Sequence, residues 1–158
     1  MKATQAMILI GLAVGLAGWI GSIVLAEPAS AAPGKPATAT AMWLEQDGQA
    51  RPFENGGRVT VGDVTVEIFV APYPPLREGS IDLYLTDKAT GKPLQRNAPK
   101  VIFDMYMPHG SIRAEALPTG GGHYLIPYKL VMPGQWRVDF TIARNGSTAA
   151  FTLIFKVD

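Results

Sequence analysis

Apolar and polar residues alternate with a period of two through most of the chain from residue 58 onward. Such alternation places every second side chain on one face of a strand and is typical of antiparallel strands with one buried face. No stretch of this part shows the 3.6-residue period of an amphipathic helix. The predicted buried faces are Val64, Val66, Ile68 and Val70; Ile81, Leu83 and Leu85; Val101, Phe103, Met105 and Met107; residues 112–117; Tyr124, Ile126, Tyr128 and Leu130; Trp136, Val138, Phe140 and Ile142; and Phe151, Leu153, Phe155 and Val157.

Residues typical of turns separate these runs. Asn145-Gly146, between the last two runs, is a strong signal for a two-residue hairpin turn. Glycine and proline also break the pattern at residues 72–79 and 120–122. About seven or eight short strands with frequent turns predict an all-β fold, an immunoglobulin-like antiparallel β-sandwich. A closed barrel is the alternative.

The N-terminal part of the sequence differs from the rest. Lys2 is followed by an uncharged, mostly apolar run over residues 3–26. As an α-helix this run would reach ~36 Å, enough to cross a ~30 Å hydrocarbon core. We therefore predict one N-terminal apolar helix over residues 1–26. It is either a retained transmembrane anchor or a signal peptide, because small residues around Ala26 and Ala31 would suit cleavage.

The distribution of charge around this helix predicts its orientation. Lys2 precedes the apolar run and no basic cluster follows it, so the C-terminal domain should face outward. We expect a single-pass protein of the cell membrane with its C-terminal domain on the periplasmic or extracellular side, or a secreted protein if the helix is cleaved. Residues 27–41 contain three prolines and six alanines and predict an extended linker. The β-sandwich domain should then occupy residues 42–158.

Charge and composition exclude several function classes. The chain has 14 Lys and Arg against 13 Asp and Glu, without the basic excess of a nucleic-acid-binding surface. It has no cysteine, which excludes disulfides, thiolate metal sites and cysteine nucleophiles. Its carboxylates are scattered over outward-facing strand positions, and no serine has the context of a nucleophile elbow. We therefore expect a protein that is not an enzyme, and we identify no small-molecule substrate.

One group of residues has metal-binding chemistry. Met105, Met107, His109 and Met132 combine three thioethers with one imidazole. Thioether sulfur is a soft, neutral ligand, so this set favours copper(I) over hard divalent ions. The alternative interpretation is that the methionines are core residues, because methionine commonly fills hydrophobic cores.

Strand direction supports grouping three of these residues. If neighbouring strands are antiparallel, the strand that ends at Met107 and the one that ends near residue 130 run the same way. Met107, His109 and Met132 should then meet at one end of the sandwich, beside residues 72–79. His123 begins the strand that ends near residue 130. It should therefore lie at the opposite end of the sandwich, ~20 Å from these three residues at ~3.3 Å per residue. It is therefore not expected to be a ligand.

Four motifs in the second half of the chain carry a family resemblance. They are Gly79-Ser80-Ile81-Asp82-Leu83-Tyr84-Leu85, Met107-Pro108-His109-Gly110, Gly122-His123-Tyr124 and Val131-Met132-Pro133-Gly134-Gln135-Trp136-Arg137-Val138. With these motifs the chain resembles the YtkA-like domain family and its FixH-type relatives, which are small exported or membrane-anchored sandwiches. The resemblance implies a role in copper handling or in the assembly of copper-containing oxidases, with a copper-containing membrane protein or a copper chaperone as partner. It implies no established catalysis.

Two functional hypotheses follow from the sequence. In the first, the domain binds copper(I) through Met107, His109 and Met132, with Met105 as a further ligand, and transfers it to a partner. In the second, it is a metal-free structural or assembly module that docks onto a membrane complex. The methionine and histidine group distinguishes the two hypotheses.

Overall fold

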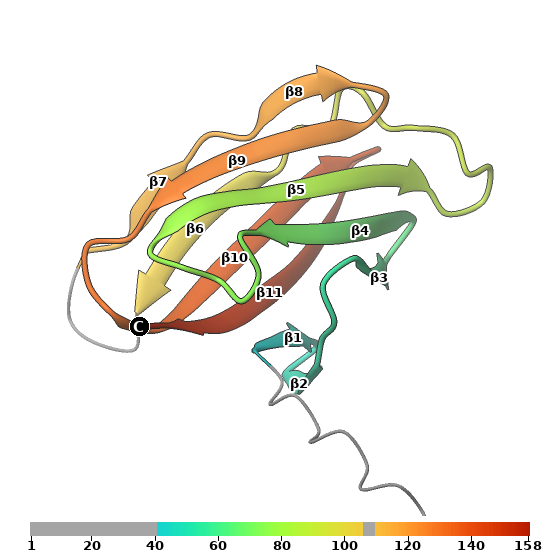
Figure 1. Ribbon diagram of the computed structural model, residues 1–158. Helices are drawn as coiled ribbons and strands as arrows, with labels where there is room; N and C mark the ends of the chain where they lie inside the picture. The colour runs from blue at the N-terminus through green and yellow to red at the C-terminus, as the bar shows by residue number, and fades with distance from the viewer. Residues whose placement is uncertain (1–40, 106–109) are drawn as a thin grey trace, which may run out of the picture. The chain divides into compact units, whose positions relative to one another are not determined.

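The computed structural model describes residues 41–105 and 110–158, and these form two antiparallel β-sheets without a helix in either range (Figure 1). In spatial order, the larger sheet contains β2 (Gln49–Pro52), β1 (Met42–Gln46), β11 (Ser147–Val157), β10 (Gly134–Arg144), β6 (Lys100–Met105) and β7 (Ile112–Ala114). The smaller sheet contains β3 (Gly57–Val61), β4 (Val64–Ala71), β5 (Glu78–Asp87), β9 (His123–Lys129) and β8 (Leu117–Gly120).

This architecture confirms the all-β prediction, and its immunoglobulin-like type stays a prediction. The predicted N-terminal apolar helix, residues 1–26, lies outside the described residues, as does the linker up to residue 40. Among the described residues, no helix is long and apolar enough to span a membrane.

The core forms between the sheets, where the alternating positions meet. Every described residue of the predicted buried faces is buried, except in the run 112–117, where only Ala116 is. On β9, Tyr128 bridges the two sheets, because its ring centroid lies 5.5 Å from that of Phe103 and 6.0 Å from that of Phe155. The period of two therefore identified the core-facing side of each long strand correctly, although β11 also buries Thr152 and Ile154 on its other face. Burial of these faces is the main favourable term in the stability of the domain.

The hairpin between β10 and β11 has the predicted two-residue turn. Arg144 pairs with Ser147, and the two residues between them, Asn145 and Gly146, have φ values of 48° and 76°. Positive φ at both central positions is the requirement of a type I′ turn, which matches the right-handed twist of the flanking strands.

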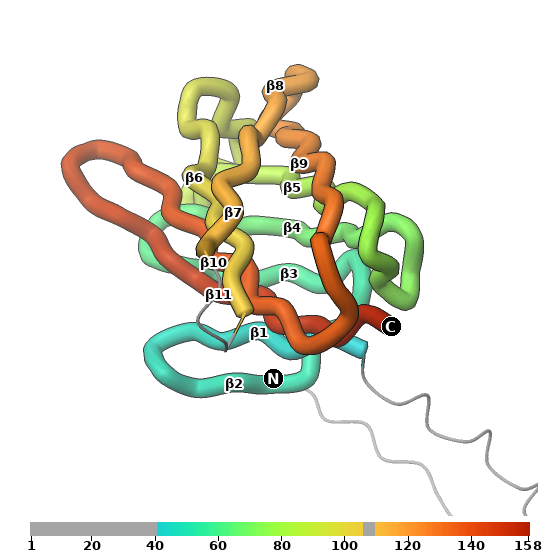
Figure 2. The backbone as a smooth tube through the Cα atoms, turned by 90° about the vertical axis from the view of Figure 1, so that its left-hand side faces the viewer, coloured from blue at the N-terminus to red at the C-terminus, as the bar shows by residue number. Residues whose placement is uncertain are grey.

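The structure differs from the prediction in its number of strands. The described residues contain eleven strands instead of seven or eight. The predicted single run 112–117 is split, because β7 joins the larger sheet and β8 joins the smaller one. All four residues of β2 and of β8 are exposed, so these edge strands have no alternating apolar face that a sequence pattern could reveal. Figure 2 shows β2 with β1 at the edge of the molecule, beside β11.

Candidate functional site

Strand pairing aligns one row of buried residues across the larger sheet. Met105, the last residue of β6, pairs with Trp136 on β10, and Trp136 pairs with Phe155 on β11. Phe155 in turn pairs with Met42, the first residue of β1. We call the end of the sandwich marked by this row the Met132 end, because the connection from β9 to β10 that contains Met132 lies there.

Met132 is held at this end by its neighbours on the chain. Its side chain is partly buried against the core. Its carbonyl oxygen accepts a hydrogen bond from the indole N–H of Trp136, at 3.2 Å. Gly134 has a φ of 136°, and a Cβ built there would lie 2.8 Å from Cε of Met105. The Met105 methyl group therefore occupies the space over Gly134, next to the turn that contains Met132.

Two of the four predicted ligands are placed by the structure and two are not. Met105 and Met132 lie at the same end of the sandwich. The strand directions predicted this end for Met107, His109 and Met132 together, and that grouping stays a prediction. Met107 and His109 lie outside the described residues, in the segment 106–109 that follows β6. In the two described ranges, no group of three histidine, cysteine or carboxylate side chains could hold a metal ion.

The loop between β4 and β5 also reaches the Met132 end. The backbone N–H of Leu130 donates to the carbonyl oxygen of Arg77, at 2.6 Å, and so joins this loop to the connection from β9 to β10. Beneath the loop lies the hydroxyl of Tyr128, which is buried and has no hydrogen-bond partner among the described residues. Burial raises the pKa of Tyr128 to about 12, because the phenolate would lose its hydration there.

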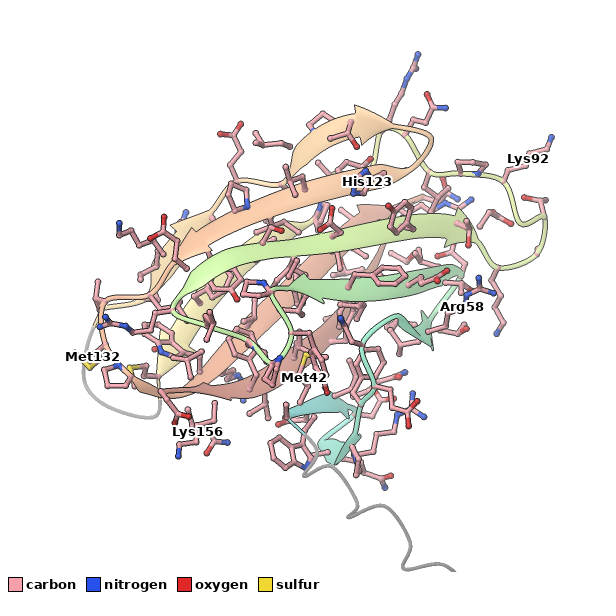
Figure 3. All side chains as sticks on the ribbon, viewed as in Figure 1. Met42, Arg58, Lys92, His123, Met132 and Lys156 are labelled. Carbon is pink, nitrogen blue, oxygen red and sulfur yellow. The ribbon has the colours of Figure 1, made fainter. Side chains whose placement is uncertain are left out.

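His123 lies at the far end of β9 from Met132, and Figure 3 shows the two residues well apart. Its Nε2 is 2.6 Å from Oδ1 of Asp82, and its Nδ1 is 2.5 Å from the hydroxyl oxygen of Thr119. The imidazole also stacks on the ring of Tyr84, with a centroid distance of 4.4 Å. Because both ring nitrogens have partners, a metal ion could bind His123 only by displacing Thr119 or Asp82.

The sequence did not predict this polar cluster, because its carboxylates, Asp82 among them, were expected to be scattered over outward-facing strand positions. Asp82 is only partly exposed, and its carboxylate faces an imidazole 41 positions later in the chain. The contact exists because β5 pairs with β9, with Tyr84 opposite His123. The three strands between them in sequence, β6 to β8, give no local signal of this pairing. The cluster connects β5, β8 and β9 on the outer face of the smaller sheet.

A second polar cluster joins three turns at the turn end of the β10–β11 hairpin. The Arg144 guanidinium donates hydrogen bonds to the carboxylates of Asp63, at 2.9 Å, and Asp87. The Arg144 hydrogen bond is the main reason why the pKa of Asp87 lies well below its usual range, and the N–H and hydroxyl of Thr90 lower this pKa further. The same hydrogen bond raises the pKa of Arg144. This cluster is a structural ion-pair network.

Comparison with known families adds to this geometry. The model of the family described as YtkA-like matches residues 58–141, which is more than half of the chain. The chain belongs to the YtkA-like family. The matched span extends from β3 into β10 and so includes the whole segment from Met105 to Met132. No curated protein and no solved structure matches the chain.

Proposed function

We propose that this YtkA-like protein is an exported, membrane-tethered binding domain. In this proposal it holds copper(I) through Met105, Met107, His109 and Met132 and acts in copper handling or in the assembly of a copper-containing oxidase. One observation carries the proposal. The fold brings Met105 and Met132 to the same end of the sandwich, and Met105 leads directly into the segment that contains Met107 and His109.

The chemistry of the donors suits this location. Thioethers are neutral, so Met105 and Met132 can sit against an apolar core without the penalty of burying a charge. They need no deprotonation and keep their affinity for copper(I) in an acidic exported compartment. His109 would add one imidazole nitrogen, which binds only in its neutral form. The domain would then hold copper(I) as cargo for a copper-containing membrane protein or a copper chaperone.

The proposal can be tested by titrating the full-length chain in detergent with copper(I) against a chromophoric competitor. His109→Ala and Met132→Leu should each weaken binding sharply. Leucine nearly conserves the volume of methionine, so Met132→Leu removes the thioether and keeps the packing. Met42→Leu is the matched control, because Met42 is buried in the same row as Met105 but is not a proposed ligand. His123→Ala should also leave binding unchanged.

The same titration has a pH dependence. Affinity should fall as the pH drops below ~6.5, because protonation of His109 removes its lone pair. If the His109 and Met132 variants bind copper(I) as tightly as the unmodified chain at every pH, the copper proposal is wrong.

One observation favours the alternative, a metal-free structural or assembly module that docks onto a membrane complex. Met105 is only 9% exposed, and its methyl group packs over Gly134 beside Trp136, as a core residue would. Met105→Leu separates the two roles, since a core role predicts unchanged copper(I) affinity and a ligand role predicts weaker binding.

Membrane attachment has its own test. Alkaline carbonate should not release the full-length chain from membranes if residues 3–26 are a retained anchor.

A further inference from the structure

Two loops at the Met132 end expose apolar side chains to solvent. Tyr73 and Leu76, in the loop between β4 and β5, are 43% and 54% exposed, and Val131, between β9 and β10, is 69% exposed. Leu76 and Val131 are the two most exposed large hydrophobic residues of the described chain. The hydrogen bond from Leu130 N–H to the Arg77 carbonyl holds the two loops together. We call Tyr73, Leu76 and Val131 the apolar tip.

The backbone of these loops has few groups that must stay hydrated. Pro72, Pro74 and Pro75 in the first loop and Pro133 in the second have no backbone N–H. In a membrane interface an unpaired N–H is costly, because less water is available to bond it. The loops can therefore approach acyl chains at a lower cost than ordinary loops. A tyrosine beside aliphatic residues is also typical of a segment at the level of lipid headgroups.

The charges near the apolar tip indicate which lipids it fits. Lys129 is paired with Glu78, at 3.2 Å, and Lys156 with Asp158, at 3.5 Å. Both lysines near this end are thus balanced by a carboxylate, and Arg77 can reach a headgroup phosphate with its long side chain. Such a surface has no need of anionic lipid and fits a zwitterionic bilayer.

The place where the described chain begins indicates that this end faces the membrane. Met42 lies in the same row as Phe155 and Trp136, so the preceding residues enter the domain at the Met132 end. The linker, residues 27–41, can extend to ~46 Å at ~3.1 Å per residue. Strands β10 and β11 have 11 residues each and are ~36 Å long. If the opposite end faced the bilayer, the linker would use most of its reach to pass along the domain.

We infer that the apolar tip rests in the interface of the same zwitterionic bilayer that anchors the chain, with Leu76 and Val131 below the headgroups. This inference rests on the membrane tether of the proposed function and is independent of copper. The tether alone only keeps the domain near the bilayer, while the apolar tip fixes which end contacts it. The domain then stands with its strands directed away from the membrane and its His123 cluster toward solvent.

The chain has no cysteine, so single labels can be placed without ambiguity. The full-length protein is reconstituted into phosphatidylcholine vesicles, and an environment-sensitive fluorophore is attached in separate variants to Leu76→Cys, Val131→Cys or Lys92→Cys. Lys92 is the control, because it is exposed in the β5–β6 connection, far from Met132 (Figure 3). In the bilayer interface, the labels at 76 and 131 should emit at shorter wavelengths because their surroundings are less polar. Nitroxide-labelled lipids should quench these two labels. The label at 92 should show neither effect.

A second arm tests the contribution of the apolar side chains. Adding Leu76→Ser to the Val131-labelled protein should reduce quenching of that label, and adding Leu117→Ser should not. Leu117 is a matched control, because it is an exposed leucine, 38%, on β8 outside the apolar tip. Equal quenching at 92 and 131, or no quenching at 76 and 131, overturns the inference. Carbonate extraction and copper titration report separately whether the anchor or the copper site of the proposed function has failed.

Discussion

The indole N–H of Trp136 donates a hydrogen bond to the carbonyl oxygen of Met132, with a nitrogen–oxygen distance of 3.2 Å. Trp136 is buried in the row that crosses the larger sheet, and Met132 lies in the turn that precedes β10. The bond therefore fixes a turn at the candidate copper site to the core. A side chain with a structural role thus determines where a proposed ligand is held.

The first prediction concerns this contact. Trp136→Ala should lower the free energy of unfolding by ~3–5 kcal/mol, because it removes a large buried side chain and leaves a cavity. Trp136→Phe keeps much of the apolar contact but lacks the indole N–H. It should therefore keep most of the packing and lower the free energy of unfolding by about 1 kcal/mol for the lost hydrogen bond. Urea unfolding measures both variants. A loss below ~1 kcal/mol for Trp136→Ala would contradict the burial of this side chain.

Two tyrosines of β9 form a matched pair for the second prediction. Tyr124 donates to the carbonyl oxygen of Leu94, at 2.9 Å, and accepts from the N–H of Asn97, at 3.1 Å, whereas the buried Tyr128 hydroxyl has no partner among the described residues. Tyr124→Phe should destabilise the domain by ~1–3 kcal/mol, because it leaves buried backbone groups unpaired. Tyr128→Phe should be neutral or stabilising, since it removes an unpaired buried hydroxyl. Thermal unfolding of the two variants side by side tests this difference, and equal destabilisation would contradict it.

The third prediction is a dependence of stability on acid. The folded protein holds the pKa of Asp87 well below its usual range, chiefly through the hydrogen bond from Arg144. The stabilisation is therefore fully present above the ~3.9 of an unperturbed aspartate and is lost as the pH falls below that value. Unfolding in urea between pH 5 and pH 2 should show this loss, and Asp87→Asn should reduce it. Asp47→Asn is the control and should keep the full loss, because Asp47 is an exposed turn residue.

The fourth prediction uses two glycines that differ only in conformation. Among the described residues, a Cβ at Gly146 or at Gly110 would meet no atom within 4 Å, but Gly146 has a φ of 76° and Gly110 has no positive φ. Gly146→Ala should therefore destabilise the domain by ~1–2 kcal/mol through backbone strain in the type I′ turn. Gly110→Ala should have little effect. Chemical denaturation compares them, and a similar effect at both positions would exclude strain as the cause.

The sequence by itself determined which side of each long strand faces the core between the sheets. Alternation along runs such as 64–70 and 136–142 predicted the core, because side chains of a strand point to opposite faces by geometry alone. The Asn145-Gly146 turn was equally local, since few residues adopt positive φ at low cost. For the candidate site, strand direction supplied the expectation that Met107, His109 and Met132 meet at one end of the sandwich, and this grouping stays a prediction. The buried faces and the hairpin turn each depend on residues close together in the chain.

Only the tertiary structure decided which strands pair and which side chains meet across them. The exposed edge strands β2 and β8 have no buried apolar face, so their pairing depends on backbone hydrogen bonds that leave no alternating pattern in the sequence. The contact between Asp82 and His123 exists because β5 and β9 are neighbours with a fixed register, although three strands separate them in sequence. Arg144 likewise reaches Asp87 through the packing of distant turns. Such contacts depend on register and packing across the whole sheet, and a pattern within one strand contains neither.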